Sequence, residues 1–327
     1  MRITRRAAIG GMVASVARPA FAAKTPMTYL LPAPATLPAF LPFQLAETRN
    51  YFADNGLAVT FATGRGGADV AKQVGVGNAD LGGGVGETSM IVRPNGVPIR
   101  GVALLGQRPL FELVTRKAAG VHAITDLRGK KIGVSSYQDT GYYALLAVLA
   151  VLAARGIERT ALQIEQVGPA GVTQLMIARS LDGIMGVPEW SDAIAAAGIP
   201  LDFFPIDRIF PAMAQAIMAS DTTVKQKPDV VRGCVKAVLQ AVRDCIADPR
   251  TAAKDYVAAV PQHARNEAQI ERILRRYVAD VYRTEPPSAL GRFDPQRLRT
   301  VQEFYFKNRI IQTRVPIEDL YTNSFVS

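Results

Sequence analysis

The chain has 327 residues, of which 49% are hydrophobic and 20% charged, and its formal net charge is +10. This length accommodates two domains with separate cores. Lys and Arg are scattered and no nucleic-acid-binding motif accompanies them, so the charge does not predict a nucleic-acid partner. Beyond the N-terminus no run of about 18 apolar residues is free of charge, Gly and Pro, so no membrane-spanning helix is predicted there.

Residues 1–22 are predicted to be an export signal. Thr4-Arg5-Arg6 precedes a weakly hydrophobic segment, residues 7–17, and Ala20-Phe21-Ala22 offers a small-x-small cleavage site. The arginine pair is typical of twin-arginine signals but also occurs in Sec signals, so the export route stays open. No cysteine follows the apolar segment, and no lipoprotein anchor is expected. We expect a periplasmic protein cleaved near Ala22; losing the four arginines of the signal lowers the formal charge from +10 to +6.

The first half of the mature chain alternates predicted strands and helices. In order, these are a strand at Met27–Leu31, a helix through Phe52, a strand at Leu57–Ala62, a glycine-rich turn at Thr63–Gly67, a short helix, a strand at Asp80–Gly83, and a helix opened by Gly86-Glu87. Alternation of this kind predicts a mostly parallel sheet covered by helices on both faces.

The glycine-rich turn does not match a nucleotide site. The dinucleotide fingerprint needs a third glycine where Asp69 stands. The phosphate loop of nucleoside triphosphatases needs Ser or Thr after its Lys, but Gln73 follows Lys72. Backbone N–H groups at a helix start still favour an anionic or carbonyl group. We therefore interpret Thr63–Gly67 as one wall of a ligand site.

The second half repeats the plan of the first at an offset near one hundred residues. The matching pairs are Gly56 with Gly156, Gly67 with Gly171, and Leu81 with Leu181. The predicted elements are a strand at Lys131–Val134, a helix from Thr140, a strand at Gln163–Val167, a loop at Gly168–Gly171, a helix at Val172–Arg179, a strand at Leu181–Val187, and a helix opened by Pro188-Glu189. Three matches in order predict two lobes built on one βαβ plan.

After Pro205 the pattern changes to a strand at Ala212–Ser220 and helical segments from Asp229 onward, which we expect to pack on the first lobe. Chain crossings near Leu110–Thr115 and Phe203–Ser220 predict a two-strand hinge. We place the lobe boundaries so that residues 23–109 and 210–327 form lobe I and residues 110–209 form lobe II.

The two cysteines, Cys234 and Cys245, fall in one predicted helix. Eleven residues separate their Cα atoms by about 16 Å along a helix axis. A disulfide needs about 7 Å or less, so free, buried thiols are expected.

Several stretches together resemble one family. They are "LPFQLAETRNYFADNGLAVTF", "GNADLGGGVGE", "ITDLRGKKIGV" and "ASDTTVKQKPDVVRGCVKAVLQA". Their order and spacing resemble the periplasmic substrate-binding proteins of ABC importers, in the group for nitrate, sulfonates, taurine and thiamine-precursor pyrimidines. The resemblance implies a two-lobed, type II-like α/β fold, ligand capture by hinge closure, an inner-membrane permease as partner, a monomer and no cofactor.

Candidate ligand contacts follow the carboxyl ends of the strands, where ligands gather on such sheets. In lobe I they are Thr36, Arg65, Gly66, Gly67, Glu87 and Thr88; in lobe II they are Ser135, Ser136, Tyr137, Thr140, Glu189 and Trp190. Helix capping alone accounts for one or two of the lobe II hydroxyls, and dipole stabilisation alone accounts for either glutamate. The resemblance implies ligand contacts at Ser135 and Ser136 and a tryptophan packed on the ligand at Trp190.

The charge of the ligand stays open at this stage. Arg65 and the helix N-termini favour an organic anion such as a sulfonate or carboxylate, which is the preferred interpretation. Glu87, Glu189 and the aromatic residues favour a nitrogen heterocycle instead. The first loop, "PAPATLPAF", supplies few donors, which speaks against nitrate or bicarbonate.

Catalysis is not expected. The only histidines, His122 and His263, have no Cys or His neighbour at metal-ligand spacing, and no G-x-S-x-G motif is present. The resemblance does include enzymes on this fold, among them a fungal pyrimidine synthase that uses cysteine and histidine clusters. Neither cluster occurs here, which speaks against catalysis. An exported enzyme on the same fold is nevertheless kept as the alternative.

Overall fold

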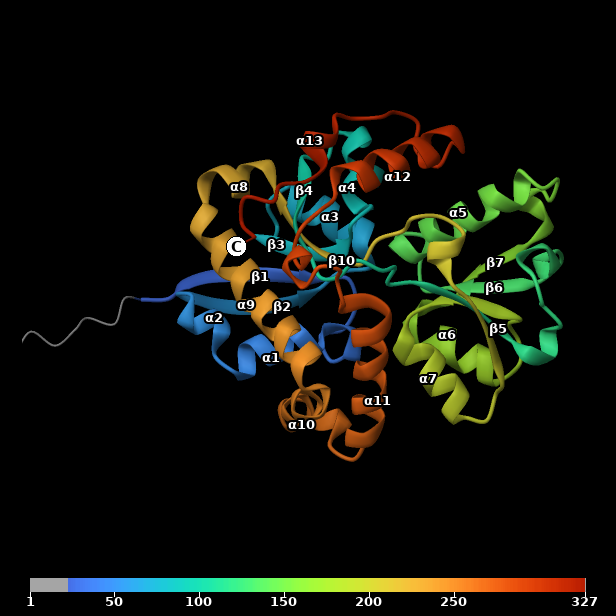
Figure 1. Cartoon of the computed structure of the whole chain (residues 1–327), viewed down its shortest axis with the longest axis horizontal. Helices are drawn as coiled ribbons and strands as arrows, with labels where there is room; N and C mark the ends of the chain where they lie inside the picture. The colour runs from blue at the N-terminus through green and yellow to red at the C-terminus, as the bar shows by residue number, and fades with distance from the viewer. Residues whose placement is uncertain (1–22, 327) are drawn as a thin grey trace, which may run out of the picture.

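The computed structural model describes residues 23–326 (Figure 1). The predicted export signal, residues 1–22 with its cleavage site near Ala22, lies outside the described residues.

The first sheet has five strands in the order β2-β1-β3-β10-β4. Their bounds are β1 (Thr25–Leu31), β2 (Leu57–Thr63), β3 (Leu81–Val85), β4 (Ile99–Leu104) and β10 (Gln215–Ser220). β1 pairs in parallel with β2 and β3, whereas β10 runs antiparallel to β3 and β4. Four strands therefore point one way and β10 is reversed. This sheet and the helices on it form lobe I.

The second sheet repeats this arrangement in the order β7-β6-β8-β5-β9. Its strands are β5 (Glu112–Arg116), β6 (Lys131–Val134), β7 (Gln163–Gln166), β8 (Gly183–Gly186) and β9 (Leu201–Phe204). β6 pairs in parallel with β7 and β8, and β5 runs antiparallel to β8 and β9. This sheet and its helices form lobe II, and the pair of sheets confirms the predicted two-lobed α/β fold (Figure 1).

The chain crosses between the lobes twice, from β4 to β5 and from β9 to β10. Each crossing leads into the one reversed strand of the sheet it enters. The lobe boundaries predicted from sequence, 109–110 and 209–210, lie within these two crossing segments and stay a prediction.

Thirteen α-helical segments are present in the described part of the chain. They are α1 (Leu41–Thr48), α2 (Tyr51–Asp54), α3 (Gly67–Gly75), α4 (Thr88–Val92), α5 (Thr140–Ala153), α6 (Gly168–Ile177), α7 (Pro188–Ala196), α8 (Asp221–Gln226), α9 (Pro228–Ala247), α10 (Pro249–Ala259), α11 (Glu267–Tyr277), α12 (Pro295–Lys307) and α13 (Ile317–Leu320). α9 packs on α1, α2 and two strands of the first sheet, while α11 contacts both α10 and α7 of lobe II (Figure 1).

Several predicted bounds need correction. The helix expected through Phe52 is interrupted, because Asn50 takes a left-handed conformation with φ 60° and separates α1 from α2. α6 begins at Gly168 rather than Val172, with Pro169 in its first turn, where its missing N–H costs no helical hydrogen bond. The true counterpart of Gly67, the first residue of α3, is therefore Gly168 and not Gly171.

The predicted bounds of the strands that precede Glu87 and Glu189 also need correction. β3 ends at Val85 rather than Gly83, and β8 spans only Gly183–Gly186. β10 begins at Gln215, three residues after the predicted start. Both cysteines are free and buried, as predicted, and burial raises the pKa of each thiol. None of the described helices combines the length and apolarity needed to span a bilayer.

Candidate ligand site between the lobes

A cavity lies between the lobes at the carboxyl ends of β1 and β3. The space open to the centres of water-sized molecules is about 70 Å³. We call it the inner cavity; its lining residues are Leu31, Pro32, Ala33, Leu37, Ala39, Phe40, Phe43, Gly83, Gly84, Val85, Leu105, Leu110, Phe111, Asp139, Thr140, Val187, Glu189, Trp190, Gln215 and Ala216. The walls are mostly apolar and aromatic, and both lobes and the first crossing segment contribute to them.

A second cavity of about 280 Å³ adjoins the first. We call it the outer cavity; its lining residues are Pro32, Ala33, Pro34, Gly64, Arg65, Gly66, Ser135, Ser136, Asp139, Pro169 and Trp190. Four residues line both cavities: Pro32, Ala33, Asp139 and Trp190. The outer cavity is lined by the guanidinium of Arg65 and the hydroxyls of Ser135 and Ser136, whereas the inner cavity is mostly apolar. The combined space therefore changes from polar at the outer cavity to apolar at the inner one.

Glu189 brings a carboxyl group to the inner cavity. It lies in the first turn of α7, directly after Pro188, and is 6% exposed. The Tyr277 hydroxyl donates to its Oε2 atom at 2.5 Å. Its Oε1 atom is buried and accepts no hydrogen bond of good geometry from residues 23–326, although the backbone N–H groups of Ala39 and of Glu189 itself are near enough to the carboxyl to favour its ionised form. Burial raises the pKa of this carboxyl to about 7. Oε1 is therefore an acceptor that a ligand could satisfy.

Gln215, the first residue of β10, supplies a second such acceptor. Its Nε2 atom donates to the carbonyl of Ala39 at 2.9 Å, which fixes the amide plane. Its Oε1 atom is buried without a partner in the described part of the chain. Unpaired buried acceptors cost about 1–3 kcal/mol each. Two such acceptors at one apolar cavity can pair with hydrogen-bond donors of a molecule bound there.

Asp139 is a site residue that the sequence analysis missed. It precedes α5 and caps it, accepting from the N–H of Gly141 at 3.4 Å and from the hydroxyl of Ser135. It lines both cavities, and burial raises the pKa of its carboxyl. An Asp before a helix is the ordinary signature of an N-cap, so the sequence offers no separate signal for a cavity position.

The glycine-rich turn serves lobe contact more than ligand contact. At Gly66, with φ 100°, an added Cβ would lie 2.7 Å from Cα of Asp139 in lobe II. The N–H of Ala68 donates to the carbonyl of Gln138 at 3.2 Å, again across the lobes. Glycine is required here because two backbones approach closely.

The expectation that these N–H groups face a ligand is wrong for Gly64, Arg65 and Gly66. Their N–H groups already donate to the Leu31 carbonyl at 2.7 Å, the Asp69 carboxylate at 3.0 Å and the Pro32 carbonyl at 2.8 Å. Arg65 still contributes its exposed guanidinium to the outer cavity.

The structure places seven of the twelve predicted residues at the two cavities and the other five outside them. Arg65, Gly66, Ser135 and Ser136 line the outer cavity, Thr140 and Glu189 line the inner one, and Trp190 lines both. Gly67 lines neither, but its Cα approaches the Thr140 side chain closely enough that a Cβ would lie 3.0 Å from it.

Glu87, which follows β3 as Glu189 follows β8, and its neighbour Thr88 do not line either cavity. Oε1 of Glu87 accepts from the N–H of Met213 at 2.6 Å, and this carboxyl lines a separate cavity of about 10 Å³ beside Tyr305. The Thr88 hydroxyl accepts from the N–H of Val85 at 2.9 Å. The Thr88 hydroxyl is therefore engaged within lobe I. The buried Oε2 atom of Glu87 has no partner among the described residues, and Phe111 and Thr140 also line its small cavity, so a ligand contact at Glu87 stays a prediction.

Thr36 and Tyr137 also lie outside the cavities. The Thr36 carbonyl accepts from the Tyr256 hydroxyl at 2.6 Å and from Nε2 of His263 at 2.8 Å. Tyr137 is 44% exposed, and its hydroxyl donates to the Ile164 carbonyl at 3.2 Å. Their backbone and hydroxyl contacts account for these positions without a ligand.

Comparisons with known proteins show which sequences and folds the chain is similar to. The riboflavin-binding protein RibY of Chloroflexus aurantiacus is 24% identical over 298 residues, covering 88% of this chain and 82% of that protein. The 4-amino-5-hydroxymethyl-2-methylpyrimidine phosphate synthase THI11 of Saccharomyces cerevisiae is 25% identical over 253 residues, 72% of each chain.

The alkanesulfonate-binding protein SsuA from Xanthomonas axonopodis pv. citri, solved bound to MOPS, superposes with a TM-score of 0.72 at 16% identity, covering 92% of this chain and 98% of that one. At this identity the likeness establishes the fold, which is that of the solute-binding proteins of ABC importers. The profile described as NMT1/THI5 like matches residues 37–252. The chain therefore belongs to the NMT1/THI5-like family.

Proposed function

We propose that the protein is an exported solute-binding protein that captures a small organic ligand between its lobes and delivers it to an ABC permease. The inner cavity takes residues from both lobes, so a ligand there would favour the closed arrangement by contacting both at once. The fold and the position of the cavity support this proposal.

We further propose that the ligand is a flat nitrogen heterocycle bearing N–H groups. The single observation that carries this is the pair of buried, unpartnered acceptors, Glu189 Oε1 and Gln215 Oε1, at a cavity walled by Phe40, Phe111 and Trp190. Aromatic walls stack on flat rings, and acceptors pair with ring or exocyclic N–H groups. The printed names of RibY and THI11 concern riboflavin and a pyrimidine, which are both heterocycles of this kind.

An organic anion, the ligand preferred from sequence, is the second candidate. Arg65 in the outer cavity favours it, and SsuA is a sulfonate binder with the same fold. In the inner cavity, however, an anion would meet the carboxyl groups of Glu189 and Asp139, where like charges repel. An anionic group is better accommodated as a substituent that reaches the outer cavity.

A binding screen tests the proposal. Trp190 is the only tryptophan of the chain and lines both cavities, so its fluorescence reports on occupancy. We expect riboflavin or 4-amino-5-hydroxymethyl-2-methylpyrimidine to change this fluorescence and raise the melting temperature, because ligand at 100 times Kd adds about 2.7 kcal/mol. MOPS should do neither. Binding of MOPS alone, weakened about tenfold or more by Arg65→Ala, would instead establish the anionic candidate.

We propose that the ligand leaves unchanged, although relatives named as synthases make an enzyme the alternative. The two cavity carboxyls are held by Tyr277 and by Ser135, and both cysteines are buried in α9. Incubating riboflavin or the pyrimidine with the protein and analysing the mixture by mass spectrometry tests this. Conversion of more ligand than protein would establish catalysis.

A monomer is expected in size-exclusion chromatography.

A further inference from the structure

Helix α11 of the C-terminal segment is fixed to lobe II by two arginines one turn apart. Arg272 donates through Nε to Oδ1 of Asp192 at 2.7 Å. Arg276 donates through Nη2 to Oε2 of Glu112 at 2.6 Å. Asp192 is on α7 and Glu112 begins β5, so the two pairs hold α11 against two different elements of lobe II (Figure 1).

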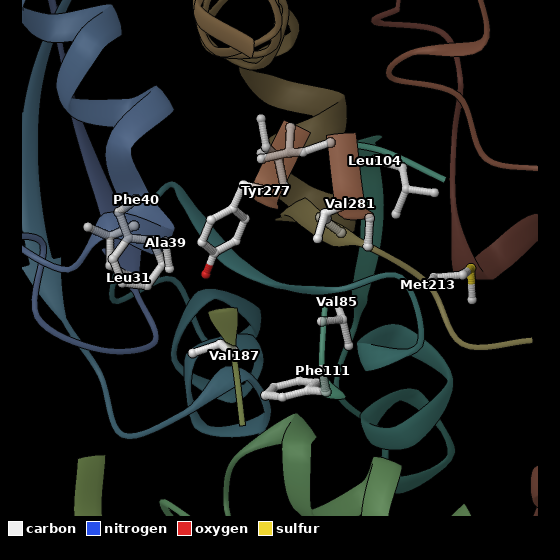
Figure 2. Packing of buried hydrophobic residues seen from close by; sticks show 14 of the residues in the cluster. Leu31, Ala39, Phe40, Val85, Leu104, Phe111, Val187, Met213, Tyr277 and Val281 are labelled. Carbon is white, nitrogen blue, oxygen red and sulfur yellow. The ribbon is translucent and has the colours of Figure 1, made fainter. Parts of the chain in front are cut away.

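Tyr277, the last residue of α11, extends from this docked helix to Glu189, which lines the inner cavity. It is fully buried, and Figure 2 shows its hydroxyl directed toward Val187, with Ala39 and Phe40 to one side. Its hydroxyl donates to Oε2 of Glu189. Because Oε2 is engaged, Oε1 is the oxygen of this carboxyl that is left for the cavity.

The other charged and titratable groups around Glu189 come from β5, α10, α11, the turn after α11 and the residue before α5. Glu112 of β5 disfavours the ionised form of Glu189, although Arg276 neutralises much of its charge. Tyr256 of α10 and Tyr282, just after α11, are buried neighbours of this carboxyl. Burial raises the pKa of Glu189, and the hydrogen bond from the Tyr277 hydroxyl lowers it, with smaller contributions from the backbone N–H groups of Glu189 and Ala39. Asp139 lines the cavity with Glu189.

We propose that Tyr277 is the positioning residue for Glu189. Its hydroxyl holds one carboxyl oxygen so that the other is presented to the inner cavity as an acceptor. The Arg272 and Arg276 pairs hold Tyr277 in place. This inference rests on the proposed function for what Glu189 contacts, and on the hydrogen-bond geometry for how the carboxyl is held.

Tyr277→Phe tests the proposal, because it removes the donor and keeps the ring. Tyr282→Phe is the matched control: its ring stacks on that of Tyr277 at 5.5 Å, and its buried hydroxyl has no partner in the described structure. Each variant is unfolded thermally across pH 5 to 9. When folding raises the pKa of a carboxyl, the free energy of unfolding of the protein falls as the pH rises from the unfolded pKa through the folded pKa. In Tyr277→Phe this decline should extend about one pH unit higher than in the wild type.

Glu87 titrates in the same range but contributes equally to both proteins, so the difference between them isolates Glu189. The shift should vanish in the double variant Tyr277→Phe/Glu189→Gln, and it should be absent in Tyr282→Phe. A shift that persists without the Glu189 carboxyl, or equal profiles for the two phenylalanine variants, would overturn the proposal.

The ligand arm uses riboflavin and 4-amino-5-hydroxymethyl-2-methylpyrimidine. Tyr277→Phe should weaken the binding of whichever probe the wild type binds about tenfold at pH 7, with recovery at higher pH as Glu189 ionises. Tyr282→Phe should leave it unchanged. If the wild type binds neither probe while the pH shift of Tyr277→Phe is present, the proposed function fails and the positioning role stands. If a probe binds equally to all three proteins at every pH, the positioning role fails and the function stands.

Discussion

The hydroxyl of Tyr277 donates to Oε2 of Glu189 at 2.5 Å, across a separation of 88 residues in the chain. The bond joins the end of the C-terminal helix α11 to the wall of the inner cavity on α7. It therefore connects the helices that pack against lobe I with a lobe II carboxyl whose other oxygen is buried beside the inner cavity.

Lobe closure depends on the absence of a side chain at Gly66. In Gly66→Ala the new Cβ would lie 2.7 Å from Cα of Asp139, so the lobes have to move apart. Gly56→Ala is the matched control, because Gly56 also has positive φ, at 75°, but has open space around its Cβ position. Gly56→Ala should lose about 1 kcal/mol of stability from backbone strain. Gly66→Ala should lose more, because its φ of 100° and ψ of 163° fall in a region that almost only glycine adopts.

Only Gly66→Ala should enlarge the radius of gyration in small-angle X-ray scattering and weaken riboflavin or pyrimidine binding, by about tenfold or more. Unchanged scattering and affinity in Gly66→Ala would show that this contact does not set closure.

Arg276 is expected to contribute more to stability than its neighbour Arg275. Arg276 donates to Glu112, to the Ser191 hydroxyl at 2.7 Å and to the Pro188 carbonyl at 3.4 Å, and the Glu112 side chain is only 17% exposed. Arg276→Met should lower the free energy of unfolding by about 1–3 kcal/mol in urea titrations. Arg275→Met removes an exposed pair with Glu271 one helical turn away and should cost less than about 0.5 kcal/mol. Equal losses would contradict the α11 docking described above.

Glu87 should make the protein less stable in alkaline than in acidic solution. Burial raises the pKa of its carboxyl to about 7, above the ordinary value of 4.5. The folded state therefore holds a proton that the unfolded state releases, and stability falls as the pH rises from about 4.5 through 7. Glu87→Gln keeps an acceptor for the Met213 N–H and should remove about 3 kcal/mol of this decline. Exposed Glu47→Gln serves as the control for charge alone, and a profile of Glu87→Gln that parallels it would refute the assignment.

The repeated strand–helix plan was predictable because it depends on local signals. The offset of the glycines and the switch between strand and helix periodicity predicted both lobes, and the observed reversed strands β5 and β10 follow the two expected crossings. Bounds failed where one residue decides them, as at Asn50, whose left-handed backbone conformation is not specified by its neighbours.

Of the residues at the ligand site, only those that directly follow a strand were predictable from the sequence. Ser135, Ser136, Glu189 and Trp190 follow strands, so topology alone brings them to one edge of a sheet. Gln215, at the start of the reversed strand β10, reaches the cavity, and Tyr277 of a distant helix reaches Glu189, through tertiary packing that no local pattern encodes. Glu87 matches Glu189 in sequence position, yet one of its carboxyl oxygens accepts from Met213 of the crossing segment and the side chain lines a different, smaller cavity.

The central claim is that the inner cavity binds a nitrogen heterocycle through an ionised Glu189 acceptor, and the most direct test is the affinity of riboflavin at pH 6 and pH 8, followed by Trp190 fluorescence. With the pKa of Glu189 at about 7, the ionised fraction of the free protein rises about tenfold over this range. We predict that affinity rises by about the same factor in the wild type and is independent of pH in Glu189→Gln. Affinity that falls with rising pH, or a pH dependence that survives in Glu189→Gln, would contradict the account.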